Sequence, residues 1–302
     1  MGTFYVPDFK YNKGIIGKLK DFYFKLLGMP FLQRRVDARM VFPVLGDIKD
    51  KNILDIGCGD GIFDLEMARR GARIEALDLS NSALERAQWR AKQLGLAQNI
   101  NFLHGDATRL PYKDSSFDIV ISNCVLEHIP GDQEVLKEVN RVLKTQGSLV
   151  ITVPREFENW DSVPARLVKV LLATPTWLKK SVCSEPVKEA TSFRNYVDLV
   201  LIPYYQVRIG YSEAEIVEKM NIAGLKTTII KGYFKMFGTW GIDMLEGFSV
   251  FRVDKGGDFG YIAKHDWLYG VTFPVFYGLS YMDSLLPRHA PSMAMLVVSR
   301  KI

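Results

Sequence analysis

The chain has 302 residues, of which 48% are hydrophobic, enough for one large α/β domain with insertions or for two domains. Its three cysteines, Cys58, Cys124 and Cys183, lie far apart and form no C-x-x-C pair, which argues against a disulfide framework or a zinc site and favours a reducing compartment. The net charge of +5 adds only a mild attraction to anionic surfaces.

Residues 1–48 are predicted to form an N-terminal helical extension. The first residues lack the charged and apolar blocks of a signal peptide, so we expect a cytoplasmic protein. Within the extension, Ile15 to Leu27 places apolar residues on one helical arc, with Lys18, Asp21 and Lys25 opposite. Two interpretations stay open: a helix that covers the active site or the sheet edge, and an interfacial helix on anionic lipid.

Residues 49–155 are predicted to form a cofactor-binding core. Ile53 begins a short apolar strand that runs into a turn with glycine at Gly57, Gly59 and Gly61, and a helix is expected from Ile62 onward. Glycine is needed where φ is positive or where a side chain would block a ligand from the backbone. A strand, a glycine turn and a helix together predict a nucleotide-type cradle.

The glycine spacing distinguishes between nucleotide ligands. The dinucleotide fingerprint G-x-G-x-x-G fails, because Ile62 stands where its third glycine would fall. The alternative, E/D-x-G-x-G-x-G, is met by Asp55 and the three glycines. Over residues 50–155 the chain resembles the class I S-adenosylmethionine-dependent methyltransferases. The resemblance implies an α/β fold with a doubly wound, seven-stranded Rossmann-like sheet and S-adenosyl-L-methionine as cofactor.

The same resemblance implies where the cofactor contacts lie. Asp78 closes the second strand and would accept from the two ribose hydroxyls, while Asp106 follows the third strand and would accept from the adenine amino group. Leu79 would pack on the adenine, although an ordinary core leucine is a competing interpretation, and a lone Asp at a strand end is often only a cap. The expected cofactor-binding residues are Asp55, Gly57, Cys58, Gly59, Gly61, Asp78, Leu79, Asp106, Ala107 and Asn123.

Further elements follow in the order expected from the resemblance. The sequence predicts a fourth strand from Ser116, a helix from Glu134 to Lys144, a fifth strand from Ser148 to Val153, helices at Ser162 to Ala173 and Ser212 to Gly224, a strand from Leu225 to Ile230 and a last strand from Ser292 to Ser299. Residues 156–302 therefore hold the final strands and two substrate-side insertions, one after strand five and one from Tyr233 to Pro291, between strands six and seven. Long insertions in compact domains are usually functional.

Within the second insertion, the segment Trp267 to Met282 contains no charge and many aromatic residues. It is too short and too interrupted to span a bilayer, which needs about twenty apolar residues. It could line an apolar pocket or dip into the headgroup region, and core packing is the competing interpretation.

Among class I methyltransferases, the chain is similar to those of quinone and lipid-linked glycan biosynthesis, which share a motif in the style of Leu126 to Pro130. This resemblance implies O- or C-methylation of an apolar or lipid-linked small molecule. Peripheral contact with the inner face of an anionic membrane is expected separately, through the Ile15 to Leu27 helix and the segment Trp267 to Met282. A nucleic-acid methyltransferase would carry Asn/Asp-Pro-Pro-Tyr/Phe where Ser122 to Val125 stand, and no dense Lys/Arg stripe is present, so no nucleic acid partner is expected. A protein methyltransferase and a non-catalytic cofactor-binding protein stay as alternatives.

Methyl transfer from a sulfonium needs little acid-base machinery, because the sulfonium carries its own leaving group. For a hydroxyl acceptor a base is useful, and His128, just past strand four, is the candidate. The competing interpretation is that His128 only bonds to the local backbone. His265 and Asp266 in the second insertion are a further candidate pair, and no metal site is expected.

Overall fold

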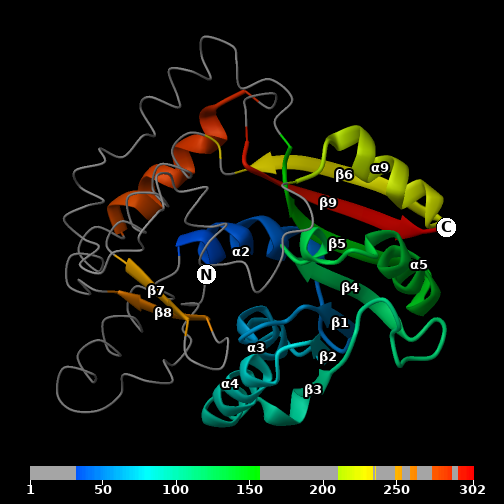
Figure 1. The fold of residues 1–302 in the computed structure, drawn as a ribbon, viewed down its shortest axis with the longest axis horizontal. Coiled ribbons are helices and arrows are strands. Elements are labelled where there is room, and N and C mark those ends of the chain that lie inside the picture. Colours follow the sequence, from blue (N-terminus) through cyan, green and yellow to red (C-terminus); the bar gives the residue numbers. More distant parts are fainter. Residues whose placement is uncertain are drawn as a thin grey trace.

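The computed structural model describes residues 32–156, 210–233, 235, 249–253, 259–263, 274–287 and 292–302. A seven-stranded sheet in the order β3-β2-β1-β4-β5-β9-β6 forms the centre of this part, with helices on its two faces (Figure 1). The strands are β1 (Asn52–Ile56), β2 (Arg73–Asp78), β3 (Ile100–His104), β4 (Phe117–Asn123), β5 (Leu143–Pro154), β6 (Leu225–Tyr233) and β9 (Ala294–Lys301). The sheet confirms the predicted fold class.

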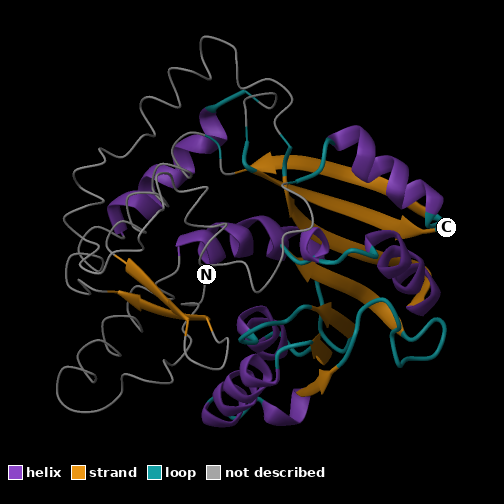
Figure 2. Cartoon of the chain, in the orientation of Figure 1, coloured by secondary structure: helices purple, strands orange, loops and turns teal. Residues whose placement is uncertain are grey.

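In the described part of the chain, helices accompany the sheet, and a separate two-stranded sheet lies outside it (Figure 2). The helices are α2 (Leu32–Leu45), α3 (Ile62–Arg69), α4 (Asn81–Gln93), α5 (Asp132–Val142) and α9 (Glu213–Ile222). Short 3-10 helices are η1 (Ala97–Asn99), η2 (Leu126–His128) and η3 (Ser280–Leu285), and the small sheet pairs β7 (Ser249–Val253) with β8 (Phe259–Ala263). Within the described residues, no helix is long and apolar enough to cross a bilayer.

Strands β1 to β5 run parallel, whereas β9 runs antiparallel to both of its neighbours, β5 and β6. Because the parallel strands share one direction, their carboxyl ends meet at one edge of the sheet, where ligands of open α/β folds bind. The glycine turn after β1, Asp78 at the end of β2, and Asn123 at the end of β4 all lie at this edge.

Both faces of the sheet are covered at its centre, which explains why the central strands β1 and β4 are largely apolar and buried. Neighbouring residues of one strand belong to opposite cores: Ile53 packs with α2 and α3, and Leu54 packs with α5 and α9. The first core is closed by Phe42 of α2, stacked on Phe63 of α3 with ring centroids 5.6 Å apart. Helix α2 is thereby part of the main core.

Several predicted elements coincide with observed ones within a few residues. The predicted helix from Glu134 corresponds to α5, and the predicted last strand corresponds to β9. Strand β5 is longer than expected, because it begins at Leu143, which pairs with Phe117 of β4. The helices predicted at Ile15 to Leu27 and Ser162 to Ala173 lie outside the described residues.

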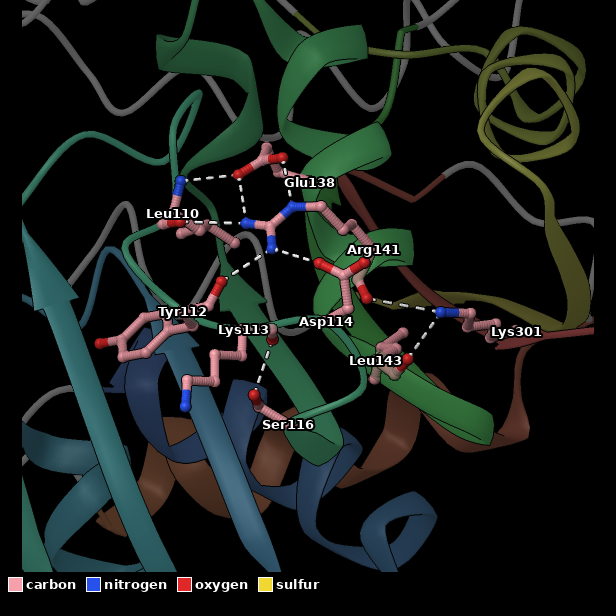
Figure 3. A network of polar contacts seen from close by, with 9 residues as sticks. All are labelled: Leu110, Tyr112, Lys113, Asp114, Ser116, Glu138, Arg141, Leu143 and Lys301. Carbon is pink, nitrogen blue, oxygen red and sulfur yellow. Dashed lines mark hydrogen bonds and ion pairs between the residues drawn. The ribbon is translucent and has the colours of Figure 1, made fainter.

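Arg141 of α5 holds the loop between β3 and β4 in place (Figure 3). Its guanidinium donates to both carboxylate oxygens of Glu138 at 2.8 Å, to Asp114 at 2.8 Å, and to the carbonyls of Tyr112 and Leu110 at 2.7 and 3.0 Å. The hydrogen bond and charge of Arg141 lower the pKa of Glu138. A fork of this kind fixes orientation as well as distance, which a single ammonium group cannot do.

Candidate active site

The turn between β1 and α3 has the backbone that its glycines were expected to permit. Gly57, Gly59 and Gly61 have φ values of 72°, 52° and 73°, a region that side chains with a Cβ rarely adopt. The N–H groups of Gly57 and Cys58 donate to the carbonyl of Leu77, at 2.7 and 3.2 Å, so the turn is fastened to the end of β2.

The three glycines serve different purposes. A Cβ on Gly59 would meet nothing within 4 Å, so this backbone faces open space. A Cβ on Gly57 would overlap the methyl groups of Val125, and one on Gly61 would lie 2.8 Å from the Cβ of Ala87 on α4. The backbone of Gly59 is therefore accessible to a ligand, whereas close packing requires Gly57 and Gly61.

Asp78 connects the cradle to the second strand. Its Oδ2 accepts from the N–H of Gly59 and its Oδ1 from the N–H of Ser80, both at 2.8 Å. Each carboxylate oxygen keeps lone-pair capacity, so two hydroxyl groups can still bind there. The next side chain, Leu79, is 62% exposed, an unusual state for leucine and the one expected of a surface that a flat apolar ring covers.

Asp60 fixes the tip of the turn to α4. Its carboxylate pairs with Arg86 and Arg90, each at 2.9 Å. Burial alone would raise the pKa of Asp60, but the two guanidinium groups outweigh burial and lower it. The turn is therefore held from the β2 side by Asp78 and from the helix side by Asp60.

Two carboxyl groups are buried beneath the turn. Asp55 at the end of β1 and Asp64 in α3 are both almost inaccessible, and Asp55 Oδ1 and both oxygens of Asp64 accept no hydrogen bond from the described residues. Burial and the neighbouring Asp64 raise the pKa of Asp55, and burial also raises that of Asp64, so the pair retains a proton. The same carboxyl groups, together with burial, raise the pKa of the Cys58 thiol.

The third strand brings Asp106 and Ala107 to the same edge. The N–H of Gly105 donates to the carbonyl of Asp78 at 3.1 Å, which places the two strand ends side by side. Asp106 is exposed and its Oδ1 caps the N–H of Thr108 at 2.9 Å, while Ala107 is buried. The cap interpretation of Asp106 is thus correct for one oxygen, and the carboxylate can still accept from an amino group.

At the end of β4, Asn123 is buried and its Oδ1 accepts from the hydroxyl of Thr152 on β5 at 3.3 Å. The next residue, Cys124, has a φ of 53° although it is not glycine, and its Sγ lies 3.5 Å from the same hydroxyl. A left-handed residue directly after a strand ends the strand abruptly and directs the chain into η2.

His128 stands at the end of η2 beside a buried acid. Its Nε2 lies 3.8 Å from Oε1 of Glu127, and the imidazole is 36% exposed while Glu127 is almost fully buried. Burial raises the pKa of Glu127 to about 7, with Arg34 and a backbone hydrogen bond acting in the opposite sense. The candidates His265 and Asp266 lie outside the described residues.

A second buried polar group joins α2 to the sheet, and sequence reasoning missed it. The hydroxyl of Tyr233 on β6 donates to Oδ1 of Asp37 at 2.9 Å, and Asp37 has no exposed surface. Burial raises the pKa of Asp37 to about 6, partly offset by Arg34 and by this hydrogen bond. The only signal in the sequence is an aspartate among Val36, Ala38 and Val41, on the apolar side of a helix.

The family model described as "Methyltransferase domain" matches residues 47–217. The chain belongs to this family. Its fold and glycine motif make it a class I S-adenosylmethionine-dependent methyltransferase, and this confirms the family that the residues at the carboxyl edge indicated.

Relatives of this methyltransferase differ in their acceptors. It is 38% identical over 122 residues to norajmaline N-methyltransferase of Rauvolfia serpentina, covering 39% of this chain and 42% of that one. It is 31% identical over 179 residues to demethylmenaquinone methyltransferase of Clavibacter sepedonicus, covering 55% of this chain and 70% of that one. The chain thus spans less than half of the length of the first of these relatives.

Solved structures support the fold alone. The geranyl diphosphate C-methyltransferase of Streptomyces coelicolor A3(2), in complex with S-adenosyl-L-homocysteine, superposes with a TM-score of 0.52 at 14% identity, covering 89% of this chain and 77% of that one. The cyclase SpnF has the same TM-score at 18% identity, covering 88% of this chain and 82% of that one. One fold therefore accommodates different chemistries, and the acceptor must be argued from the site.

The residues at the edge fit S-adenosylmethionine. The cofactor's adenosine has two ribose hydroxyls and a flat ring. The edge offers the two oxygens of Asp78 for the hydroxyls, the exposed Leu79 for the ring and the open backbone of Gly59. Asp55 Oδ1, which accepts no hydrogen bond from the described residues, leaves a buried polar atom beneath this edge. When bound, this cofactor supplies an activated methyl group on a sulfonium with its own leaving group.

The protein's contribution is then mainly positional. Asp78 and Asp60 hold the turn rigid from both sides, so the backbone of Gly59 is preorganised. Asn123 and Cys124 mark the place at the end of β4 from which the chain continues to Glu127 and His128. Two titratable side chains, Glu127 and His128, therefore follow shortly after the end of β4.

Proposed function

We propose that this methyltransferase transfers a methyl group to a hydroxyl oxygen of an apolar or lipid-linked small molecule, with His128 as the proton acceptor. The observation that carries the proposal is the Glu127–His128 pair directly after β4, with one member buried and the other accessible. A carbon acceptor of the same apolar class is the nearest alternative.

The arrangement suits a base because the two side chains differ in exposure. His128 is accessible enough to receive a proton from a bound molecule, and the carboxyl group of Glu127, 3.8 Å away, stabilises the protonated imidazole when it is ionised. With S-adenosylmethionine bound, His128 would accept the hydroxyl proton as the methyl group moved to oxygen, and the electron pair of the broken bond would stay on sulfur. The reaction then needs no reactant other than the cofactor and the acceptor.

The names of the relatives support an apolar acceptor with a hydroxyl. Ubiquinone biosynthesis O-methyltransferase of Coxiella burnetii is 34% identical over 112 residues, and the relative from Clavibacter sepedonicus also acts on a quinone by its name. The norajmaline enzyme is named for nitrogen as acceptor, so an amine is the second candidate. An amine of an alkaloid would partition with small molecules, whereas a lipid-linked acceptor would partition with lipids.

The test is methylation of a membrane extract and of a water-soluble extract with cofactor labelled in its methyl group. We expect label in the apolar fraction, in a bond that resists mild base. His128→Gln should lower kcat by about 10²-fold or more, since general-base catalysis contributes on this scale, and should leave S-adenosyl-L-homocysteine affinity unchanged. Glu134→Gln, on the exposed first turn of α5, is the matched control. Label only in the soluble fraction, or full activity of His128→Gln, would contradict the proposal.

A further inference from the structure

The segment between β8 and β9 carries a helix with an uncharged outer surface. Residues 274–279 are helical and continue into η3, visible in orange-red in Figure 1. The exposed residues of this stretch are Pro274, Val275, Gly278, Tyr281, Met282, Ser284 and Leu285. Val275 is 60% exposed and Leu285 is 79% exposed, in a chain of which 24% of residues are charged.

The polar contacts of the same helix point inward. Asp283, the one charged residue of 274–287, is buried and accepts from the N–H of Lys235 at 3.0 Å. Lys235 Nζ in turn donates to the carbonyls of Leu286 and Pro287, at 3.1 and 2.7 Å. The usual orientation of a surface helix, with charges toward water and apolar residues toward the core, is thus partly reversed.

Helix α2 supplies the other inward contacts and the rim of the surface. Arg39 donates to the carbonyl of Ser280 at 3.0 Å, and its guanidinium lies 3.9 Å from the ring centroid of Tyr281. Arg35 lies 4.9 Å from the ring centroid of Tyr277, whose hydroxyl is 3.0 Å from that of Tyr281. Apolar side chains are therefore bordered by tyrosine hydroxyls and guanidinium groups.

We propose that Val275, Met282 and Leu285 form a membrane-docking surface that lies on an anionic bilayer. Apolar side chains would enter the boundary of the acyl chains, and tyrosine and arginine would stand at headgroup level, where such side chains are favoured. Cations at the rim complement anionic headgroups.

A bilayer suits this surface better than a protein does. The stripe from Val275 to Leu285 is about 17 Å long, at about 1.5 Å per residue in the α-helical part and about 2.0 Å in η3. A stable protein interface needs roughly 800 Å² per partner with matching shape. A bilayer accommodates a single stripe without any matching shape. A second copy of this chain is therefore the less favoured occupant.

Helix α2 connects the docking surface to the sheet, because its Arg35 and Arg39 contact the docking helix and its Asp37 accepts from Tyr233 of β6. Supply of a lipid-linked acceptor through this surface rests on the proposed function, whereas docking itself does not.

The test is sedimentation of the full chain with phosphatidylcholine vesicles and with vesicles that also contain phosphatidylglycerol. We expect binding that increases with phosphatidylglycerol and weakens with salt. Leu285→Gln should reduce partitioning about tenfold and Val275→Gln with Leu285→Gln about a hundredfold, from the hydrophobic burial that each loses. Ile222→Gln on α9, where Ile222 is also 60% exposed, is the matched control and should bind like the wild type.

Absence of binding to every vesicle, or an equal loss in Ile222→Gln, would overturn the proposal. So would a dimer in sedimentation velocity that Leu285→Gln dissolves, since the surface would then join two copies of the chain. Methylation of a detergent-solubilised extract is measured in the same variants. It should be retained, which separates failure of docking from failure of the proposed function.

Discussion

The two halves of the carboxyl edge are built in different ways. After β1 and β2 the edge is a backbone cradle, in which Gly59 faces open space and Asp78 holds the turn through N–H groups. After β4 to β6 the edge is made of buried titratable side chains, Glu127 and Asp37, and one of these comes from a helix outside the core motif. The first half depends on local sequence and the second on contacts between distant parts of the chain. Substitutions in the first half should therefore change cofactor affinity, and those in the second should change stability.

The largest expected effect is in the cradle. Gly59→Val should lower S-adenosyl-L-homocysteine affinity at least about a hundredfold, because the branched side chain would enter the open space, and should cost about 1 to 2 kcal/mol of stability from its left-handed backbone. Titration calorimetry and thermal unfolding measure the two quantities.

Gly95 provides the control for Gly59. It has a φ of 67° and nothing within 4 Å of its Cβ position, but it lies in the turn after α4. Gly95→Val should lose about as much stability as Gly59→Val, and its affinity for S-adenosyl-L-homocysteine should not change. Gly57→Val should lose both, because of Val125. Equal affinities for Gly59→Val and the wild type would remove the cradle from the cofactor site.

The next effect belongs to Asp78. Asp78→Ala should weaken cofactor binding by about 1.5 to 3 kcal/mol, the range for hydrogen bonds to a charged group, and should also lower stability because two N–H groups lose their acceptor. Asp47→Ala, which removes a comparable cap on Lys49, should leave affinity unchanged in the same calorimetric titration. Tighter binding of NAD than of S-adenosylmethionine would reject the assignment altogether.

On the other half of the edge, Asp37 predicts a pH effect. Its pKa in the folded state, about 6, is raised above the ordinary value of 3.8, so its favourable contribution is present below about pH 4 and is lost as pH rises through 6. Asp37→Asn avoids that loss. The stability of the variant relative to the wild type should therefore rise by about 2 kcal/mol between pH 4.5 and 7.5 in urea titrations. A relative stability that falls over this interval would show that Asp37 is held ionised instead.

The smallest effect lies away from both halves. Arg141→Lys should cost about 1 kcal/mol, because an ammonium cannot reproduce the fork to Glu138, and cofactor affinity should not change. Arg73→Lys, at an exposed ion pair 3.9 Å from Asp50, should cost close to nothing by the same unfolding measurement. Loss of affinity in Arg141→Lys would mean that the loop it holds shapes the cradle.

The difference between the halves also explains what could be predicted from the sequence. The cradle was predictable because one short segment contains the strand, the turn and the glycines, and Asp78 follows at a fixed interval. Asp37 and Tyr233 are 196 positions apart, and no local pattern indicates that they meet. Asp64 and Glu127 are acids on buried faces, where propensity and periodicity favour apolar residues, so only the assembled structure identifies them.

The position of β9 determines the order in which the molecule can be completed. Strands β1 to β5 can pair as they leave the ribosome, but β6 borders only β9, and β9 lies at residues 294–301. Tyr233 on β6 can therefore reach its place beside Asp37 only after β9 has been synthesised. During translation the turn after β1 and Asp78 can therefore form before the contact between Tyr233 and Asp37. A ligand that binds this turn stabilises the early part of the fold.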